Sequence, residues 1–244
     1  RFLMVDIKLM KKIVILLVLV FSVLYGQSQI FKGMVIGGMN LTQVEGDEFA
    51  GFNRFGANVG AGVYVGFDKK WGVSMETLFS QKGSHQGQQY ETVIDSLGNQ
   101  KNGSYDLHLN YVEIPLIFHY TDRERMTVGL GVSYSRLVSV DETEHGIHKD
   151  GTTVESGIYD KNNFDGLVDV RFALYKNLKL NARWSYSLNV IRSRTFTTID
   201  GVSNSWTRDQ RNHAISIRLI WVFNENAISI SDARRKKNAE KMGI

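Results

Sequence analysis

The sequence predicts an all-β protein, an eight-stranded antiparallel up-and-down transmembrane β-barrel preceded by a signal peptide, and three observations support this. Apolar and polar residues alternate over long runs, which is the period of a strand with two different faces. The connections between these runs are alternately short and long, as in a meander. Helical periodicity is almost absent after the N-terminal segment. At 244 residues, 43% of them apolar, the chain has enough material for a core or for an apolar surface.

The first element has the pattern of a secretory signal peptide. Residues 10–12 (MKK) are a charged start, and residues 13–25 form a 13-residue apolar run that is too short to span a membrane as a helix. Gly26 and Ser28 then supply the small residues of a cleavage site. We expect residues 1–28 to be an upstream extension and a cleaved signal peptide; the alternative is a buried N-terminal helix.

Eight alternating segments follow, and each predicts one strand. The clearest is LKLNARWSYSLNV at 178–190, where every second residue is apolar and every residue between is polar. The predicted strands are residues 30–41, 55–67, 71–83, 105–120, 126–138, 163–175, 178–192 and 211–223. The connections at 42–54, 84–104, 139–162 and 193–210 are long and polar, and the other three are short. Closing this meander into a barrel removes both exposed edges.

A soluble lipocalin-like barrel has the same alternation with its apolar side inward, so the orientation rests on further features. Strands of about 12 residues are long enough to cross a bilayer at a tilt. The polar face is small and glycine-rich, which suits a narrow lumen. Aromatic residues beside the short turns or the barrel end predict an interfacial girdle of Phe67, Trp71, Tyr120, Trp221 and Phe223. These features favour a barrel in the outer membrane, contacting its lipid.

Charged residues on the inward face are expected to pair with one another. In YVEIPLIFHY, at 111–120, the alternation places Glu113 inside, and a buried carboxylate requires a cation. The candidate cations are Arg171, Lys179, Arg183 and Arg218. The predicted barrel-interior charge network therefore consists of Glu76, Glu113, Asp169, Arg171, Lys179, Arg183 and Arg218.

Two irregularities are expected in the same strand. Leu107 and Leu109 have the opposite phase to Val112, which predicts a bulge near Asn110. Pro115 is the chain's only proline, and it lacks the N–H that a ladder needs. We therefore expect a ladder defect at Pro115.

Composition excludes several kinds of site. The chain has no cysteine, so it has no disulfide, thiolate metal site or thiol nucleophile. No Ser, His and Asp set has a spacing typical of catalysis, and no glycine loop follows a strand and opens a helix, so no catalytic residue, metal or cofactor is predicted. A weak metal site at His145 and His148 with Glu142 or Glu144 is the alternative.

The formal charge of +4 lies at the two ends of the chain, and residues 29–223 are close to neutral, so no nucleic-acid surface is expected. Residues 224–244 form a basic tail that would lie in the periplasm. It is either a solvated end or a short helix that docks on a periplasmic partner or an anionic surface.

Residues 37–84, together with NYVEIPLIFHY at 110–120, resemble the PorT-like outer-membrane β-barrel proteins of Bacteroidota. The matching positions are Gly38 and Asn40, Gly60 and Gly62, Glu76, residues 81–83 and residues 111–116. The resemblance implies an outer-membrane barrel over residues 29–223, in a family named after a member linked to type IX secretion. The tail beyond Phe223 departs from the pattern, because many such barrels end at that aromatic residue.

The predicted function is therefore that of a non-enzymatic outer-membrane barrel. It would act as a structural or interaction protein through its long extracellular loops or its periplasmic face, as an accessory of an envelope or secretion assembly. An envelope protein partner would bind at residues 224–244 or at the loops. The alternative is a small pore or a small-solute-binding barrel.

Overall fold

The computed structural model describes residues 31–47, 51–68, 70–94, 98–122, 125–197 and 205–225, with 238–240 and 242. The predicted signal peptide and most of the predicted basic tail lie outside the described residues. Among the described residues, no helix has the length and apolar character needed to cross a membrane.

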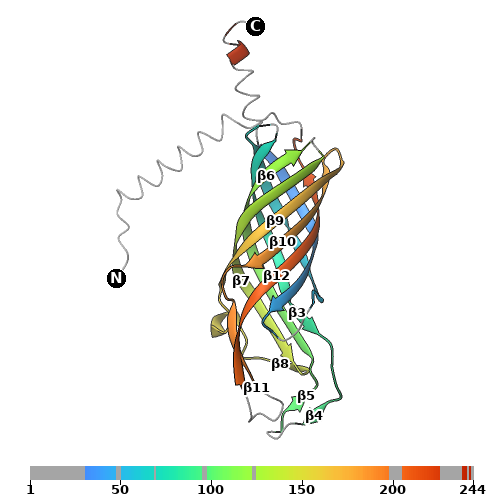
Figure 1. The fold of residues 1–244 in the computed structure, drawn as a ribbon, viewed down its shortest axis with the longest axis vertical. Helices are drawn as coiled ribbons and strands as arrows, with labels where there is room; N and C mark the ends of the chain where they lie inside the picture. The colour runs from blue at the N-terminus through green and yellow to red at the C-terminus, as the bar shows by residue number, and fades with distance from the viewer. Residues whose placement is uncertain are drawn as a thin grey trace, which may run out of the picture.

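Eight long strands form a closed antiparallel ring (Figure 1). They are β1 (Phe31–Glu45), β2 (Arg54–Gly66), β3 (Trp71–Gln86), β6 (Tyr105–Asp122), β7 (Met126–Glu144), β9 (Asn162–Tyr175), β10 (Leu178–Ser187) and β12 (Ser205–Val222). Each strand pairs with its neighbour in the chain, and β1 pairs with β12 from Met34↔Val222 to Glu45↔Arg211, which closes the ring. The predicted eight-stranded antiparallel up-and-down barrel is confirmed.

The shorter elements gather at one end of the ring, where the long connections lie (Figure 1). They are β4 (Val93–Ile94), β5 (Gln100–Lys101), β8 (Ile147–His148), the 3₁₀ helix η1 (Val154–Ser156) and β11 (Arg192–Thr197). The predicted seventh strand is wrong at its end: β10 stops at Ser187, and β11 pairs instead with the first part of β12. Several strands also extend past their predicted limits at this end.

The two faces of the barrel are inverted relative to a soluble protein. Large apolar side chains stand on the outside, such as Leu116, Leu130 and Ile217, which are 50%, 67% and 43% exposed. Inside, charged and hydroxyl side chains are buried. This inversion is what a hydrocarbon environment selects, because lipid solvates the apolar surface, whereas polar and charged side chains find hydrogen-bonding partners only inside the barrel.

Aromatic side chains mark both margins of the apolar surface. At the short-turn end, Phe67, Trp71, Trp221 and Phe223 are exposed, and the Trp71 ring lies 4.7 Å from that of Tyr120. A second set, which was not predicted from the sequence, lies toward the long-loop end and includes Tyr134, Phe164, Trp184 and Tyr186. Aromatic rings at two levels bound an apolar band between them.

A bulge on β7 changes which of its residues face inward. The β6–β7 register shifts between Asn110 and Tyr111, whose partners are Ser139 and Leu137, so Val138 is the extra residue. The irregularity predicted near Asn110 is thus present, but it does not reverse β6: its Leu107 and Leu109 side chains are buried inside. Past the bulge, β7 turns Glu142 into the interior.

Pro115 interrupts the ladder on one side of β6. Pairs between β3 and β6 run to Met75↔Leu116 and resume in the same register at Leu78↔Glu113, whereas on the other side Pro115 stands opposite Ser133 of β7. A missing N–H explains a local gap without a register shift. The gap agrees with the predicted ladder defect.

Candidate functional site

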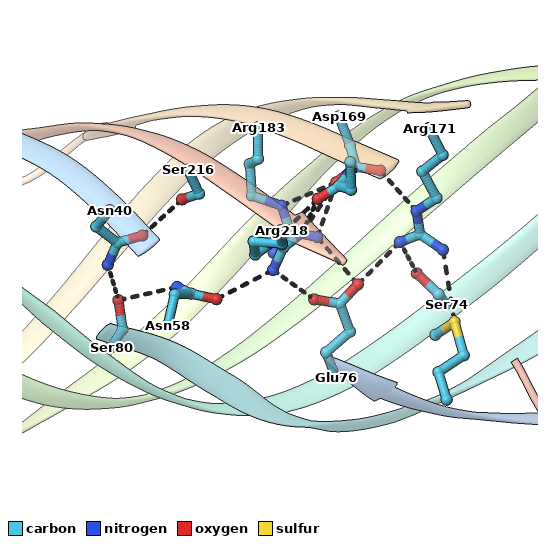
Figure 2. A network of polar contacts seen from close by, with 12 residues as sticks. Asn40, Asn58, Ser74, Glu76, Ser80, Asp169, Arg171, Arg183, Ser216 and Arg218 are labelled. Atoms are coloured by element: carbon cyan, nitrogen blue, oxygen red, sulfur yellow. Dashed lines mark hydrogen bonds and ion pairs between the residues drawn. The ribbon is translucent and has the colours of Figure 1, made fainter. Parts of the chain in front are cut away.

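The centre of the lumen holds a cluster of three arginines and two carboxylates (Figure 2). Glu76 of β3 forms an ion pair with each of the three arginines. Its Oε1 lies 2.8 Å from Arg171 Nη2 and 3.0 Å from Arg183 Nη2, and its Oε2 lies 3.3 Å from Arg218 Nη1. The arginines come from β9, β10 and β12, across the barrel from β3. Alternation aims each of them inward.

Asp169 of β9 completes this cluster from the opposite wall. Its Oδ1 accepts from Arg171 Nε at 2.8 Å, and its Oδ2 lies 2.9 Å from Arg183 and 3.3 Å from Arg218. Each of these side chains is at most 4% exposed. Buried charges persist when they are paired and hydrogen-bonded in this way.

A belt of amides and hydroxyls satisfies the remaining donors. Arg218 Nε donates to Asn181 Oδ1 at 2.8 Å, and Arg218 Nη1 donates to Asn58 Oδ1 at 3.3 Å. Asn58 continues through Ser80 to Asn40 and so to β1. Figure 2 shows this chain of contacts running from the arginines around the wall of the barrel.

A second charged cluster lies nearer the long-loop end. Lys82 Nζ is 2.5 Å from Glu113 Oε1 and 2.8 Å from Asp165 Oδ2. The cation expected for Glu113 was one of four candidates on the last three strands, and that expectation is wrong, because the partner is Lys82 of β3. The signal was present, since Lys82 has the same phase along its strand as Glu76. Asp165 has the same phase as Asp169 and was also missed.

The two clusters balance each other in charge. The central one holds three arginines and two acids, and the second holds one lysine and two acids, so their formal excesses are +1 and −1. The Lys82 ammonium also lies 5.5 Å from the ring centre of Tyr111. A neutral interior limits the long-range cost of burying so many charges.

Lys179, also predicted for the network, lies elsewhere. Its Nζ is 3.0 Å from Glu225 Oε1 at the short-turn end, where Lys32 also contacts Glu225. Its side chain is partly exposed, so it does not join the central cluster. Its position next to the turn at Lys176 and Asn177 accounts for the difference, because the first residues of β10 lie at the rim.

Apolar side chains fill the lumen on both sides of the charged clusters. Toward the end where β1 begins and β12 ends, the buried set is Met34, Ile36, Leu78, Ile220 and Val222. Toward the long-loop end it is Val44, Tyr105, Leu107, Leu109, Tyr111, Leu137, Tyr159 and Ile191. The interior therefore changes from apolar to charged and back to apolar along the barrel.

The segment containing η1 caps the long-loop end through Tyr159. The Tyr159 side chain is buried, and its hydroxyl accepts from Arg192 Nη1 at 2.5 Å. Arg192 also binds Glu142 at 2.8 Å, and Glu142 in turn accepts from Tyr105 and Thr152. Burial, together with the Glu142 carboxylate, raises the pKa of Tyr159 to about 12.

The histidines of this end do not gather around one point. His148 lies 3.7 Å from Asp141 and 3.4 Å from Asp150, whereas His145 lies 3.9 Å from Glu144. In the part of the chain that the structure describes, no group of three or more His, Asp or Glu side chains is placed to hold a metal ion.

A closed sheet with an apolar exterior and a paired, charged interior defines an integral β-barrel membrane protein. Residues 27–192, more than half of the chain, match the family described as "Outer membrane protein beta-barrel domain". The chain belongs to this family, and the predicted location in the outer membrane is confirmed. In such barrels the short turns face the periplasm and the long loops face outward.

Solved outer-membrane proteins are similar at low identity. Ail of Yersinia pestis is 15% identical over 79% of this chain and 98% of its own, with a TM-score of 0.44. A major outer membrane protein of Thermus thermophilus is 14% identical over 79% and 99%, with a TM-score of 0.43. OprG of Pseudomonas aeruginosa is 12% identical over 78% and 95%, with a TM-score of 0.37. No curated protein matches the chain.

Proposed function

We propose that this protein is a non-enzymatic outer-membrane barrel that acts as a structural or interaction protein through its extracellular end or its periplasmic face. The observation that carries the proposal is the filled lumen. Glu76, Asp169 and Arg218 are fully buried at its centre, where Arg218 contacts both carboxylates. A solute would have to separate these pairs to pass.

The energetic cost of opening such a path is large. Removing one partner of a buried ion pair destabilises a protein by roughly 3–5 kcal/mol, and a conducting path would break several pairs at once. An eight-stranded barrel leaves an interior that side chains just fill. These two considerations support a closed scaffold whose working surfaces are outside the lumen.

We further propose that the chain is PorT-like, comes from a member of the Bacteroidota and serves as an accessory of an envelope or secretion assembly. The positions that carry the resemblance support this, because they build the interior. Glu76 lies in the central cluster and Asn40 in the amide belt. A Cβ at Gly38 would lie 2.3 Å from the Ile217 carbonyl oxygen, and one at Gly60 would lie 2.0 Å from that of Thr77.

The proposed layout is a removed segment at 1–28, the barrel at 29–223 and a periplasmic tail at 224–244. Partners are outer-membrane lipid on the apolar surface and an envelope protein at the tail or the long loops. Glu225 holds the start of the tail against the barrel through Lys32 and Lys179, which supports a fixed exit for the tail on the periplasmic side.

One observation favours the alternative of a small pore or solute-binding barrel. Buried polar atoms of Asn163, Asn212 and Gln210 have no hydrogen-bond partner among the described residues. Water or a small hydrogen-bonding solute would satisfy them. Asn163 donates to Asp165 of the second charged cluster, and Gln210 stands opposite Arg192, which contacts Tyr159.

Planar-bilayer recording of the purified mature protein separates the two functions. We expect no stable single-channel steps from the wild type. A matched variant, Arg218→Ala, removes the central hub and should raise the leak above that of the wild type. Stable unitary steps from the wild type would overturn the scaffold proposal.

A further inference from the structure

Strands β11 and β12 form a two-stranded ribbon beyond the end of β10 (Figure 1). Their register places Arg192, Arg194 and Phe196 opposite Gln210, Arg208 and Trp206 on one face. The other face carries Ser193 opposite Asp209 and Thr195 opposite Thr207. Because directly opposed residues of an antiparallel pair point to the same side, the ribbon has two chemically different faces.

The hydroxyl face is satisfied by its own contacts. Ser193 Oγ donates to Asp209 Oδ1 at 2.7 Å, and the hydroxyls of Thr195 and Thr207 are 2.8 Å apart. These cross-strand bonds use the polar groups of the face within the ribbon. A substitution on the hydroxyl face can therefore serve as a control for substitutions on the opposite face.

The arginine face carries two like charges side by side. Arg194 and Arg208 are directly opposed, and like charges in that position destabilise a ribbon unless they are countered. Arg194 is countered by Glu144, 2.5 Å from its Nη2, and its guanidinium lies over the Phe196 ring at 4.9 Å. Arg208 is exposed, and it makes no ion pair with any residue that the structure describes.

Two aromatic rings lie beside this charge. Phe196 and Trp206 are the next pair on the same face, with ring centroids 6.3 Å apart and planes at 21°. Trp206 is 36% exposed. An exposed flat aromatic surface next to an exposed guanidinium has apolar and cationic binding groups side by side.

The face lies well outside the lipid. The last pair between β12 and β1 is Glu45↔Arg211, and Trp206 is five residues further along β12. At about 3.3 Å per residue, Trp206 lies roughly 17 Å along the strand from the last pair between β12 and β1. The aromatic pair is therefore not part of the interfacial girdle.

We propose that the ribbon face formed by Arg194, Phe196, Trp206 and Arg208 binds a sulfated polysaccharide outside the membrane. A planar guanidinium matches the oxygens of sulfate or phosphate with two parallel hydrogen bonds. The C–H face of a sugar ring packs against the exposed indole. A ligand with both groups satisfies Arg208 and covers Trp206 together. This inference rests on the proposed function, since it names a partner class for the extracellular end.

The test uses the whole mature protein in detergent micelles and a fluorescent dextran sulfate oligosaccharide, with binding followed by anisotropy. Arg208→Gln and Trp206→Ala should each weaken binding by roughly tenfold. Two controls should leave it unchanged: Thr207→Ala on the hydroxyl face, and Arg136→Gln, which removes an exposed cation that contacts Asn162 on another strand. Each variant is first shown to be folded by its migration on an unheated gel.

Several results would overturn the inference. They are the absence of binding by the wild type, equal weakening by Arg208→Gln and Arg136→Gln, and no effect of Trp206→Ala. Poly-glutamate binding as tightly as the sulfated saccharide would also overturn it, because an acidic chain without sugar rings would then suffice. Absence of binding together with silent bilayer recordings would remove the ligand and leave the closed scaffold standing.

Discussion

Arg218 and Glu76 meet at the centre of the barrel, with Arg218 Nη1 3.3 Å from Glu76 Oε2 and neither side chain exposed to solvent. Arg218 also contacts Asp169 and Asn181, so it joins β12 to β3, to β9 and to its neighbour β10. The order of stability among variants of this cluster follows from which charges each substitution leaves unpaired.

Glu76→Leu should destabilise the barrel more than Arg218→Met. The first leaves three arginines around Asp169 alone, whereas the second leaves two arginines with two acids. We expect a loss of roughly 3–5 kcal/mol for Glu76→Leu and a clearly smaller loss for Arg218→Met. Urea unfolding in lipid vesicles measures both, with the exposed Glu155→Gln as a control. Equal losses from the two buried substitutions would contradict this pairing.

The second cluster predicts a similar asymmetry. Lys82→Met leaves two carboxylates, Glu113 and Asp165, in the lumen without a cation. Glu113→Gln leaves the Lys82–Asp165 pair intact. Lys82→Met should therefore cost roughly 3–5 kcal/mol and Glu113→Gln much less. The same unfolding measurement applies, and a larger loss from Glu113→Gln would contradict the assignment of Lys82 as the shared cation.

Adjacent glycines of β1 provide a matched pair. Gly38→Ala places a methyl group 2.3 Å from a backbone oxygen, whereas Gly37→Ala meets nothing within 4 Å. We expect Gly38→Ala to destabilise the barrel by about 1–3 kcal/mol and Gly37→Ala to be nearly neutral. Thermal unfolding followed by gel shift would measure the difference. Similar midpoints would mean that β1 and β12 adjust more freely than their register suggests.

The cap, meaning residues 149–161 that cover the long-loop end through Tyr159, should detach from the barrel at high pH. Tyr159 has a pKa of about 12 when docked, against 10.0 when free, so the docked form keeps its proton over a window in which the detached form loses it. Docking is fully present below pH 10 and is lost as pH rises toward 12. Cleavage of residues 149–161 by an alkaline protease should accelerate across this window.

Tyr159→Phe is the control for the cap, since it keeps the ring and removes the titration. Its cleavage rate should lack the component with a midpoint near pH 12. The same pH dependence in this variant and in the wild type would assign the effect to another group.

Alternation along the strands predicted the ring, the outward apolar face and the inward direction of Arg171, Arg183 and Arg218. It failed where a strand leaves the lipid. There both faces meet polar surroundings or protein, and the two-residue period fades, so RSRTFT at 192–197 looks like a loop. Val138 shows the other limit, because one inserted residue exchanges the faces of everything after it.

The ion pairs inside the lumen could not be predicted from the sequence, for a different reason. Phase says which side chains point inward but not how high each one sits, because the strands are tilted and staggered. Glu113 and three of the four candidate cations, Arg171, Arg183 and Arg218, share the interior, yet the cation that contacts Glu113 belongs to Lys82. Only the three-dimensional stagger of the strands distinguishes these pairings.

The seam between β1 and β12 joins the first and last strands of the barrel domain. No hairpin can nucleate it, and it forms only once the final strand has been synthesised and delivered. Contacts of such long sequence separation slow folding. Until then both terminal strands have open edges that can pair with other chains. The unfolded polypeptide must therefore be kept from aggregating in the aqueous compartment before it is inserted.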